Sequence, residues 1–536
     1  MVRAGIPRRL AKGWALSAFM VMVMLCGTAA SGIQAQEQEP EPVPEEDIER
    51  ILKFKDTPVM MQTYLNLVMD QDQPYDEIGY GASYAGDYFT AAFDFSLIND
   101  DKYVPSESYM FGHYFSLNEG RFGLQYQPLS FNAGRLTHSD VVDTPYSLFI
   151  SSMEIPTVQA DFTYDGNFFF YSTRWLLLNQ NSEWYRTKVP VYDDGTGEIT
   201  DINEPIPIFD DDDAGALVGY VADPLDRGAN YKLYGFKIGD WRFGAQESVV
   251  YIDQTFYPEY FFSPLPMYFT QLVNSTSGKP WTQRADENIH LGAFVDVTRP
   301  EYYGYFQFIL GDVNLDFLVP DQDLRQPWKV GWSIGGSYQF DFGRLGFYHA
   351  GASKFLFAAT TAESDSYSRK RYEYTYYPAV EYFYEDRLET LWYYDNYIGY
   401  KYGENNLAFM MTYENTFADI DVTGMMEYVV SGSKSPANPW HELDRFPNGT
   451  KMFNDDQLEH TFRIGSTIRY RYLGWEFGGA FKVGYRMNSL ELVETDPDEP
   501  KIFKPVGEDQ FLYELFLGVK YTFDVQPNPN NYREAE

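Results

Sequence analysis

Five basic side chains near the carboxyl end of the chain are spaced so that they could bind an anion. They are Arg463, Arg469, Arg471, Lys482 and Arg486. Residues an even number apart share one face of a strand, so two strands here would carry basic stripes. Guanidinium groups bind carboxylates or phosphates through paired hydrogen bonds, and a basic stripe in a pore attracts anionic solutes or acidic sugars. In the alternative, these cations pair with acidic neighbours such as Glu476 and Glu514.

The sequence lacks the arrangements that are typical of enzymes. His138-Ser139-Asp140 brings three triad residue types together, but neighbours on a strand point to opposite faces and cannot form a triad alone. No phosphate-binding loop, zinc-protease helix or nucleophile elbow occurs. We therefore predict no enzymatic activity and no cofactor.

Metal binding is also not predicted. The six histidines are scattered without ligand spacing: His113, His138, His290, His349, His441 and His460. The acidic run Asp210 to Asp213 offers oxygen ligands that suit calcium, but it lacks the alternation of a calcium loop. We interpret that run as a solvated loop.

The elements that must position these residues are strands. In Phe511 to Phe523 the odd positions are all apolar, while the even positions include Glu514, Gly518 and Lys520. This alternation gives one apolar and one mixed face, over a length that crosses a bilayer as a tilted strand. Unpaired backbone groups are costly in hydrocarbon, so such a sheet must close into a barrel.

The same alternation recurs upstream, which predicts an all-β, closed, antiparallel transmembrane barrel of roughly 16 to 18 strands. Thr461 to Tyr472 and Gly474 to Arg486 form a hairpin with a turn at Leu473-Gly474. The further candidate strands are Glu77 to Phe95, Tyr109 to Leu117, Arg121 to Leu129, Ser147 to Met153, Val158 to Tyr164, Phe168 to Leu176, Tyr231 to Ile238, Phe243 to Tyr251, Tyr303 to Leu310, Trp332 to Phe342, Leu345 to Phe355, Trp392 to Tyr402 and Leu407 to Tyr413.

Composition supports the membrane barrel. Aromatic residues make up 18% of the chain, which suits the girdles of a membrane barrel, although a soluble β protein could use them in its core. After the amino terminus no apolar run is long enough for a transmembrane helix. The net charge of −37 does not favour nucleic acid as a partner.

The amino terminus predicts export. A basic start is followed by an apolar stretch from Trp14 to Gly27 and then by small residues, so residues 1–35 are expected to be a cleaved signal peptide. The single cysteine, Cys26, lies within it, so the mature chain would have no disulfide. We predict a periplasmic linker, short helical segment or partial plug at 36–75, the barrel at 76–524, and a polar tail at 525–536.

Two resemblances add to this reading. Phe516-x-Gly518-x-x-Tyr521-x-Phe523 resembles the terminal signal that barrel-assembly machinery binds, with Phe516 in place of a polar residue. A second resemblance, to the capsule-assembly Wzi-like family, rests on four segments: 134–151, Trp241 to Ser248, Tyr303-Gly304-x-Phe306 and Gly311-Asp312-x-Asn314. Where this chain has Gly311-Asp312, the family usually has an acidic pair. The resemblance implies a large outer-membrane barrel with a periplasmic helical part, some relatives binding surface polysaccharide.

Three functions remain open for a barrel in outer-membrane lipid. The first is a Wzi-like barrel that binds or organises surface polysaccharide through loop aromatics such as Trp281 and Trp440. The second is a diffusion porin for small solutes, with the basic stripe as its selectivity element. The third is a structural or adhesive surface barrel.

Overall fold

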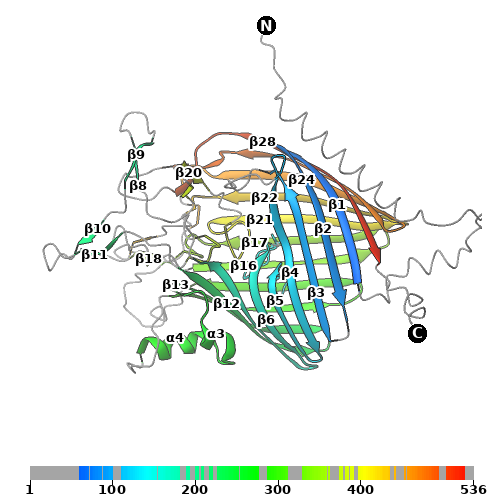
Figure 1. Ribbon diagram of the computed structural model, residues 1–536, viewed down its shortest axis with the longest axis horizontal. Helices are drawn as coiled ribbons and strands as arrows, with labels where there is room; N and C mark the ends of the chain where they lie inside the picture. Colours follow the sequence, from blue (N-terminus) through cyan, green and yellow to red (C-terminus); the bar gives the residue numbers. More distant parts are fainter. Residues whose placement is uncertain are drawn as a thin grey trace, which may run out of the picture.

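The computed structural model describes residues 59–524, apart from 72, 87, 101–109, 154, 181–188, 193–198, 204–206, 210–216, 221–225, 253, 277–286, 312–326, 328, 359, 362–372, 378–380, 385–386, 391–395, 435–439, 442–451, 454 and 494–501. The described part is a closed antiparallel barrel (Figure 1). The predicted all-β, closed antiparallel barrel is therefore confirmed, while the predicted short N-terminal helical segment is not shown.

Eighteen described strands form the wall, the upper end of the predicted range. They are β1 (Val59–Asp70), β2 (Pro74–Ala85), β3 (Phe89–Ile98), β4 (Tyr114–Tyr126), β5 (Leu129–Leu136), β6 (Thr157–Asp165), β7 (Phe169–Asn179), β12 (Arg227–Ile238), β13 (Trp241–Ile252), β14 (Glu287–Thr298), β15 (Tyr302–Gly311), β16 (Lys329–Phe340), β17 (Gly343–Ala352), β21 (Asn406–Phe417), β22 (Ile420–Ser431), β24 (Glu459–Tyr472), β25 (Trp475–Met487) and β28 (Gln510–Asp524).

Smaller elements lie in the connections. Ten short strands form two-stranded sheets: β8 (Val189–Tyr192), β9 (Ile199–Asn203), β10 (Pro207–Phe209), β11 (Leu217–Tyr220), β18 (Thr360–Thr361), β19 (Glu381–Tyr384), β20 (Arg387–Thr390), β23 (Trp440–His441), β26 (Leu490–Val493) and β27 (Ile502–Pro505). The described helices are α3 (Pro258–Phe262) and α4 (Met267–Thr276). No helix in the described ranges has the length and apolar character to cross a membrane.

The first strand corrects the predicted domain boundary. We expected residues 36–75 to be a linker, helical segment or plug, but Val59–Asp70 is strand β1, and Pro74 and Tyr75 belong to β2. Strand β1 pairs with both β2 and β28, so it closes the ring. Without it, two strand edges would be unpaired inside the membrane. Met60, Met61, Leu65 and Met69 have a loosely helical spacing but lie in this strand, so the described barrel begins at Val59 instead of 76.

Five other predicted strands are also corrected. Two of them, Tyr109 to Leu117 and Arg121 to Leu129, both overlap the single strand β4. Ser147 to Met153 and the described part of Trp392 to Tyr402 are not wall strands. Both lie largely buried inside the barrel and are enclosed on both sides, so their apolar residues mark no separate lipid and lumen faces. Glu77 to Phe95 contains two strands, β2 and β3, joined at residues 86–88.

The two ends of the barrel differ. At one end strands join through short turns, such as Leu473-Gly474 between β24 and β25, where both residues have positive φ as a two-residue hairpin requires. The long connections, α3 and α4 lie at the other end, on the left of Figure 1. The first and last described residues, Val59 and Asp524, lie at the short-turn end, because the start of β1 pairs with the end of β28. We refer to the long-loop end and the short-turn end below.

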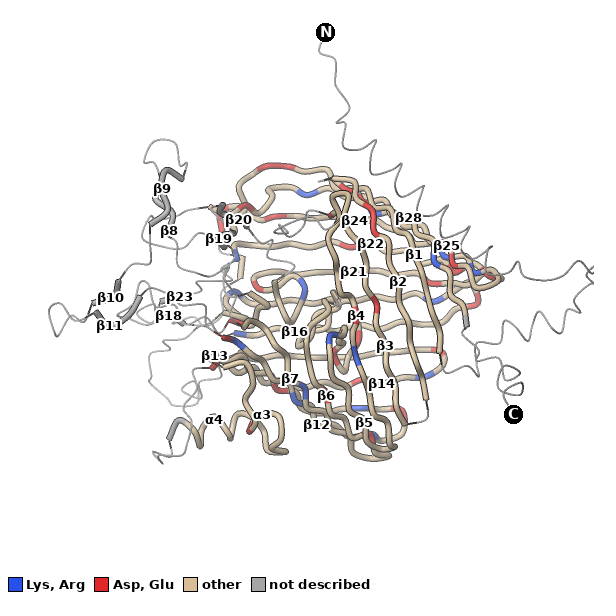
Figure 2. The backbone as a smooth tube through the Cα atoms, viewed as in Figure 1, with Lys and Arg blue, Asp and Glu red and all other residues tan. Residues whose placement is uncertain are grey.

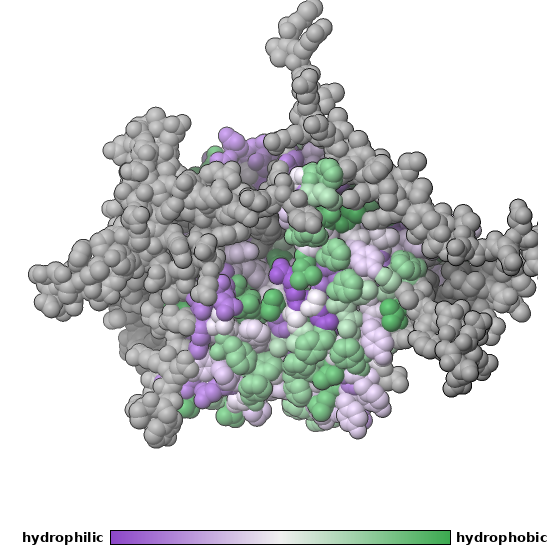
Figure 3. Space-filling view, viewed as in Figure 1, coloured by the Kyte–Doolittle hydropathy of each residue, from purple (hydrophilic) through white to green (hydrophobic). Residues whose placement is uncertain are grey.

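The outer wall is apolar. Alternating residues such as Leu515 and Leu517 on β28, or Phe477 and Phe481 on β25, are exposed on the outside. Apolar side chains cover much of the barrel face seen in Figure 3. Near the short-turn end aromatic rings contact one another across neighbouring strands, as in Trp475–Tyr521 and Phe168–Phe236. This band and its aromatic rim are the features that membrane barrels present to lipid.

Candidate functional site

A segment between β5 and β6 folds into the lumen instead of staying in the loop region. Thr137, Ser139 and Asp143 of this segment are exposed, but residues 146–151 are all buried, and Val142, Tyr146 and Phe149 have no exposed surface. Phe149 packs against Tyr231, an inward-facing residue of β12, with ring centroids 6.1 Å apart. Three further segments, 353–358, 373–377 and 396–405, join the same buried cluster. We call these four segments the plug.

Backbone hydrogen bonds connect the plug segments to one another. Ser151 donates to the Ile398 carbonyl at 2.7 Å, and Tyr400 donates to the Leu148 carbonyl at 3.1 Å. Ile398 in turn donates to Tyr374 at 3.3 Å. Because buried backbone groups need partners, this ladder allows irregular chain to lie inside the barrel.

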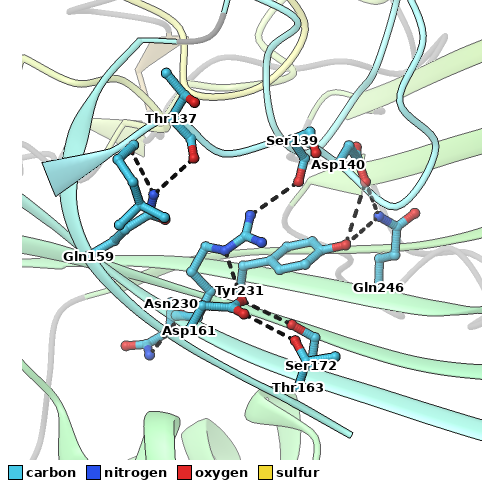
Figure 4. Close-up of polar contacts among 12 residues, drawn as sticks. Thr137, Ser139, Asp140, Gln159, Asp161, Thr163, Ser172, Asn230, Tyr231 and Gln246 are labelled. Carbon is cyan, nitrogen blue, oxygen red and sulfur yellow. Dashed lines mark hydrogen bonds and ion pairs between the residues drawn. The ribbon is translucent and has the colours of Figure 1, made fainter. Parts of the chain in front are cut away.

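Asp140 is the main polar link between the plug and the wall (Figure 4). Its Oδ1 accepts a hydrogen bond from Gln246 Nε2 at 2.6 Å, and its Oδ2 accepts one from Gln307 Nε2 at 2.9 Å. The backbone N–H groups of Val141 and Phe149 also donate to this carboxyl, at 2.7 and 2.9 Å. Gln246 and Gln307 are inward-facing residues of β13 and β15, so one carboxyl joins two wall strands to two points of the plug.

Two ionisable groups in the plug are strongly affected by burial. Burial raises the pKa of Asp140, which the hydrogen bonds from Gln307, Phe149 and Gln246 oppose. Burial, assisted by the charge of Arg174, lowers the pKa of His138 to about 3, so this ring is neutral at pH 7. His138 and Asp140 were predicted not to form a triad with Ser139. Here Asp140 contacts wall glutamines, while His138 Nε2 lies 3.5 Å from the Tyr376 hydroxyl.

The plug reaches across the lumen. Tyr146 donates to Glu427 Oε1 of β22 at 3.0 Å, and β22 lies half-way around the ring from β6. Lys401 of the plug pairs with the same carboxylate at 3.1 Å. Residues 137–153 therefore extend from the wall to which they are joined to the opposite wall.

The predicted basic residues all lie on the inward parity of β24 and β25, but they divide into two groups. Toward the long-loop end, Arg463 contacts the plug residue Tyr402 at 3.1 Å and Glu427 at 3.6 Å, and Arg486 lies 3.5 Å from Glu459. These two cations are part of the packed interior. They are held by the plug and by wall acids.

Toward the short-turn end the basic residues are water-accessible. The Arg471 side chain is 57% exposed and pairs with Asp421 at 2.6 Å and Glu476 at 2.9 Å. Arg469 lies opposite Asp421 in the strand ladder, and near mid-height of the wall the half-exposed Lys482 pairs with Glu514 at 3.0 Å. Figure 2 shows acidic and basic positions side by side on these strands. From mid-height to the short-turn end this part of the lumen thus carries exposed charges of both signs, paired as the alternative for Glu476 and Glu514 predicted.

The other predicted residues are less fully described. Trp440 lies in β23, which pairs with β18 in the loop region, while Trp281, Asp210 to Asp213, residues 1–58 and the tail 525–536 lie outside the described residues. Gly518, Tyr521 and Phe523 lie in the closing strand β28, and the Tyr521 ring packs between Trp475 and Phe523. Within the described ranges no group of three His, Cys, Asp or Glu side chains is placed to hold a metal ion.

Sequence reasoning missed Gln246 and Gln307 as site residues. Both are fully buried polar side chains on strands whose other inward positions are partly apolar. A buried amide needs a hydrogen-bond partner. A glutamine at an inward position of a partly apolar strand could therefore have indicated a polar contact inside the barrel.

Comparison with known proteins gives structural likeness only. No family model and no curated protein matches the chain. Among solved structures it resembles Wzi of Escherichia coli, described as a carbohydrate-binding β-barrel involved in group 1 capsule assembly, with TM-score 0.48 and 11% identity, covering 91% of this chain and 90% of Wzi. It also resembles Acinetobacter baumannii OccAB2 (TM-score 0.41, 10% identity, 88% and 98% covered) and Pseudomonas aeruginosa OccD3 (0.39, 10%, 88% and 92%). These values are too low to carry an argument about function, so the proposals below rest on this chain's own residues.

Proposed function

We propose that this chain is a plugged outer-membrane barrel that binds or organises surface polysaccharide at its long-loop end. The observation that carries the proposal is the plug, whose Asp140, Tyr146 and Phe149 join opposite walls of the lumen. A barrel packed in this way in its long-loop half is poorly suited to diffusion of solutes. It is well suited to act as a rigid base for surface loops.

The side that faces the exterior follows from the loops. Membrane barrels carry short turns on the periplasmic side and long loops outside. With that orientation, β23, which contains Trp440, lies in an outer connection, and Trp281 falls in the sequence between β13 and β14. The ring face of a tryptophan can pack on a sugar ring, and neighbouring polar groups can bind the sugar hydroxyls. In this orientation the long loops lie on the cell exterior, where surface polysaccharide is found.

Glycan retention tests this function. Purified protein would be incubated with the surface polysaccharide of its own cells, and the bound sugar would be measured for the native chain, Trp440→Ala and Trp281→Ala. We expect several-fold weaker retention in at least one loop variant. Trp241→Ala is the matched control, because Trp241 is an exposed residue of the outer wall near the short-turn end. Equal retention in all four proteins, or none in any, contradicts the proposal.

A diffusion porin is the second candidate, favoured by the water-accessible charges around Arg471 and Lys482. Single-channel recording from the full mature chain in a planar bilayer separates the two. Ohmic steps in the native chain, with Arg469→Glu shifting the preference toward cations, would support the porin. A silent but inserted native chain would favour the plugged barrel.

A further inference from the structure

Two helices lie outside the barrel wall at the long-loop end (Figure 1). Residues 254–276, which include α3 and α4, follow β13 and pack against its outward-facing Val249 and Tyr251. Tyr257, Tyr260 and Met267 of this segment form one buried cluster with those wall residues and with Ile289 of β14. We call residues 254–276 the outer segment.

Polar side chains of the wall bind the outer segment. Lys232 of β12 points outward and donates to the Ser263 and Leu265 carbonyls at 2.6 and 2.8 Å. Glu247 of β13 accepts from the Met267 N–H at 2.7 Å, where a carboxylate satisfies the amino terminus of α4. A lysine and a glutamate on the outer wall would be costly against lipid. The outer segment is therefore part of the folded wall at this place.

Helix α4 has the reverse of the usual amphipathic arrangement. Apart from Met267, its buried side carries the polar Thr270 and Asn274, each 9% exposed, and Asn274 donates to the Tyr257 hydroxyl of the same segment at 2.7 Å. Its apolar residues Phe269, Leu272 and Val273 face outward, with Phe269 56% and Val273 59% exposed. The helix contains no charged residue. In water such a helix would turn its apolar stripe inward.

The apolar stripe is continuous with the lipid-facing band. On β12 and β13 the outward residues nearer the short-turn end, Phe236, Ile238, Trp241 and Phe243, are exposed and apolar. Farther along the same strands the outward positions are Lys232 and Glu247, and there the outer segment covers the wall. Phe262 and Leu265 before α4 are exposed as well. Acyl chains that contact the lipid-facing band would therefore also contact the apolar stripe of α4.

We propose that the outer segment is a lipid-contacting element seated in the outer leaflet, with the acyl chains of that leaflet against Phe269, Leu272 and Val273. It widens the membrane-contacting surface on one side of the barrel. It also shields the outward-facing polar residues Lys232 and Glu247 from lipid. This inference depends on the membrane barrel and is independent of the ligand at the long-loop end.

Spin labelling tests the proposal in the full chain reconstituted into phospholipid vesicles. Single cysteines at Phe269 and Val273 would be made in a Cys26→Ser background, because Cys26 is the one cysteine of the sequence. Collision rates of the label would be measured with oxygen, which partitions into lipid, and with a water-soluble nickel chelate. Leu124→Cys, on the exposed outer face of β4, is the lipid control, and Glu259→Cys, exposed in the same segment, is the water control.

We expect the labels at 269 and 273 to show a high ratio of oxygen to nickel collisions, like Leu124→Cys, with the opposite ratio at 259. Nickel collisions at 269 and 273 equal to those at 259 would overturn the proposal. Shielding from both reagents, with spin–spin broadening that grows with the protein-to-lipid ratio, would overturn it in favour of a second copy of this chain. Shielding without broadening would contradict it in favour of a folded-over loop.

Discussion

Asp140 is the residue on which the plug depends most. A buried carboxylate that accepts hydrogen bonds from two wall glutamines and two backbone N–H groups stabilises their arrangement, each bond to a charged group contributing about 1.5–3 kcal/mol. The same donors are left unsatisfied if the acceptor is lost.

Asp140→Asn should loosen the plug, because an amide brings a donor to a site filled with donors. We expect about 2–4 kcal/mol of lost stability in the plug and the appearance of single-channel openings in a planar bilayer. Asp165→Asn, on an exposed residue at a short turn, is the control and should stay silent. A silent Asp140→Asn chain with unchanged stability would show that Asp140 does not hold the plug.

His138 should make the plug sensitive to acid. Its folded pKa of about 3 lies below its ordinary 6.5, so the unfolded ring binds a proton first. Stability from this group is present above pH 6.5 and is lost as pH falls toward 3, by at most about 1.4 kcal/mol per pH unit. Asp140, whose pKa is raised, has the opposite effect over the range above 3.8. His138→Gln removes only the first contribution.

Conductance at pH 7 and pH 4.5 measures this effect. The native chain should open more often at the lower pH than His138→Gln does. If both proteins show the same pH dependence, protonation of His138 does not weaken the plug.

At the scale of the element, the hairpin between β24 and β25 depends on Gly474. Its φ of +81° is left-handed, and an added Cβ would lie 2.7 Å from the Thr522 carbonyl oxygen. Gly474→Ala should therefore cost about 1–2 kcal/mol or more, seen as a lower urea midpoint in tryptophan fluorescence. Gly478→Ala meets only ordinary contacts and should leave the midpoint nearly unchanged. Equal midpoints for the two variants would contradict the expected strain.

The closing strand β28 carries the proposed barrel-assembly signal. Tyr521 and Phe523 face outward in the last strand, beside Trp475. If machinery binds this strand, Phe523→Ala should lower the amount of inserted protein in cells several-fold and leave refolding of purified chain into vesicles unchanged. Val519→Ala, in the same strand, is the control. Equal loss in cells and in vesicles would indicate a packing defect instead of a lost signal.

The wall could be predicted from the sequence because its pattern is local. The alternation in β24, β25 and β28 arises because one face of each strand contacts lipid and the other faces the lumen. The position of each residue in this alternation is therefore enough to place the five basic residues, Arg463, Arg469, Arg471, Lys482 and Arg486, on the inward face. β1 was missed because its alternation is weak. The inward residues Gln62, Tyr64 and Asn66 are polar or half-polar, but the inward positions on either side of them are the apolar Met60 and Val68.

The plug could not be predicted in this way. Tyr146, Phe149 and Ile398 are buried on every side, so they leave no periodicity, and their partners Glu427 and Gln307 lie far away in the sequence. The sequence does not predict the outer segment either, because the stripe Phe269, Leu272, Val273 is short and does not indicate which of its sides meets lipid.

At the scale of the whole molecule, the two halves of the barrel interior along its axis differ in character. The long-loop half is a packed core of plug and wall, whereas the short-turn half carries exposed, paired charges such as Arg471 with Asp421 and Glu476. Exposed ion pairs contribute little stability, so these charges can be changed with little effect on folding. Substitution of these charges is therefore expected to leave the stability of the barrel nearly unchanged.

Residues 137–153 are joined to the wall at both ends, through β5 and β6, and touch β22 at their far point. A domain attached by one end can leave a pore by sliding out, but a loop anchored twice can only bend. The contact between Tyr146 and Glu427 lies farthest along the chain from both β5 and β6. Bending of the loop would therefore displace Tyr146 most, and this contact would separate first. Any passage through this barrel would then be an eccentric slot beside β22 that never reaches the full bore.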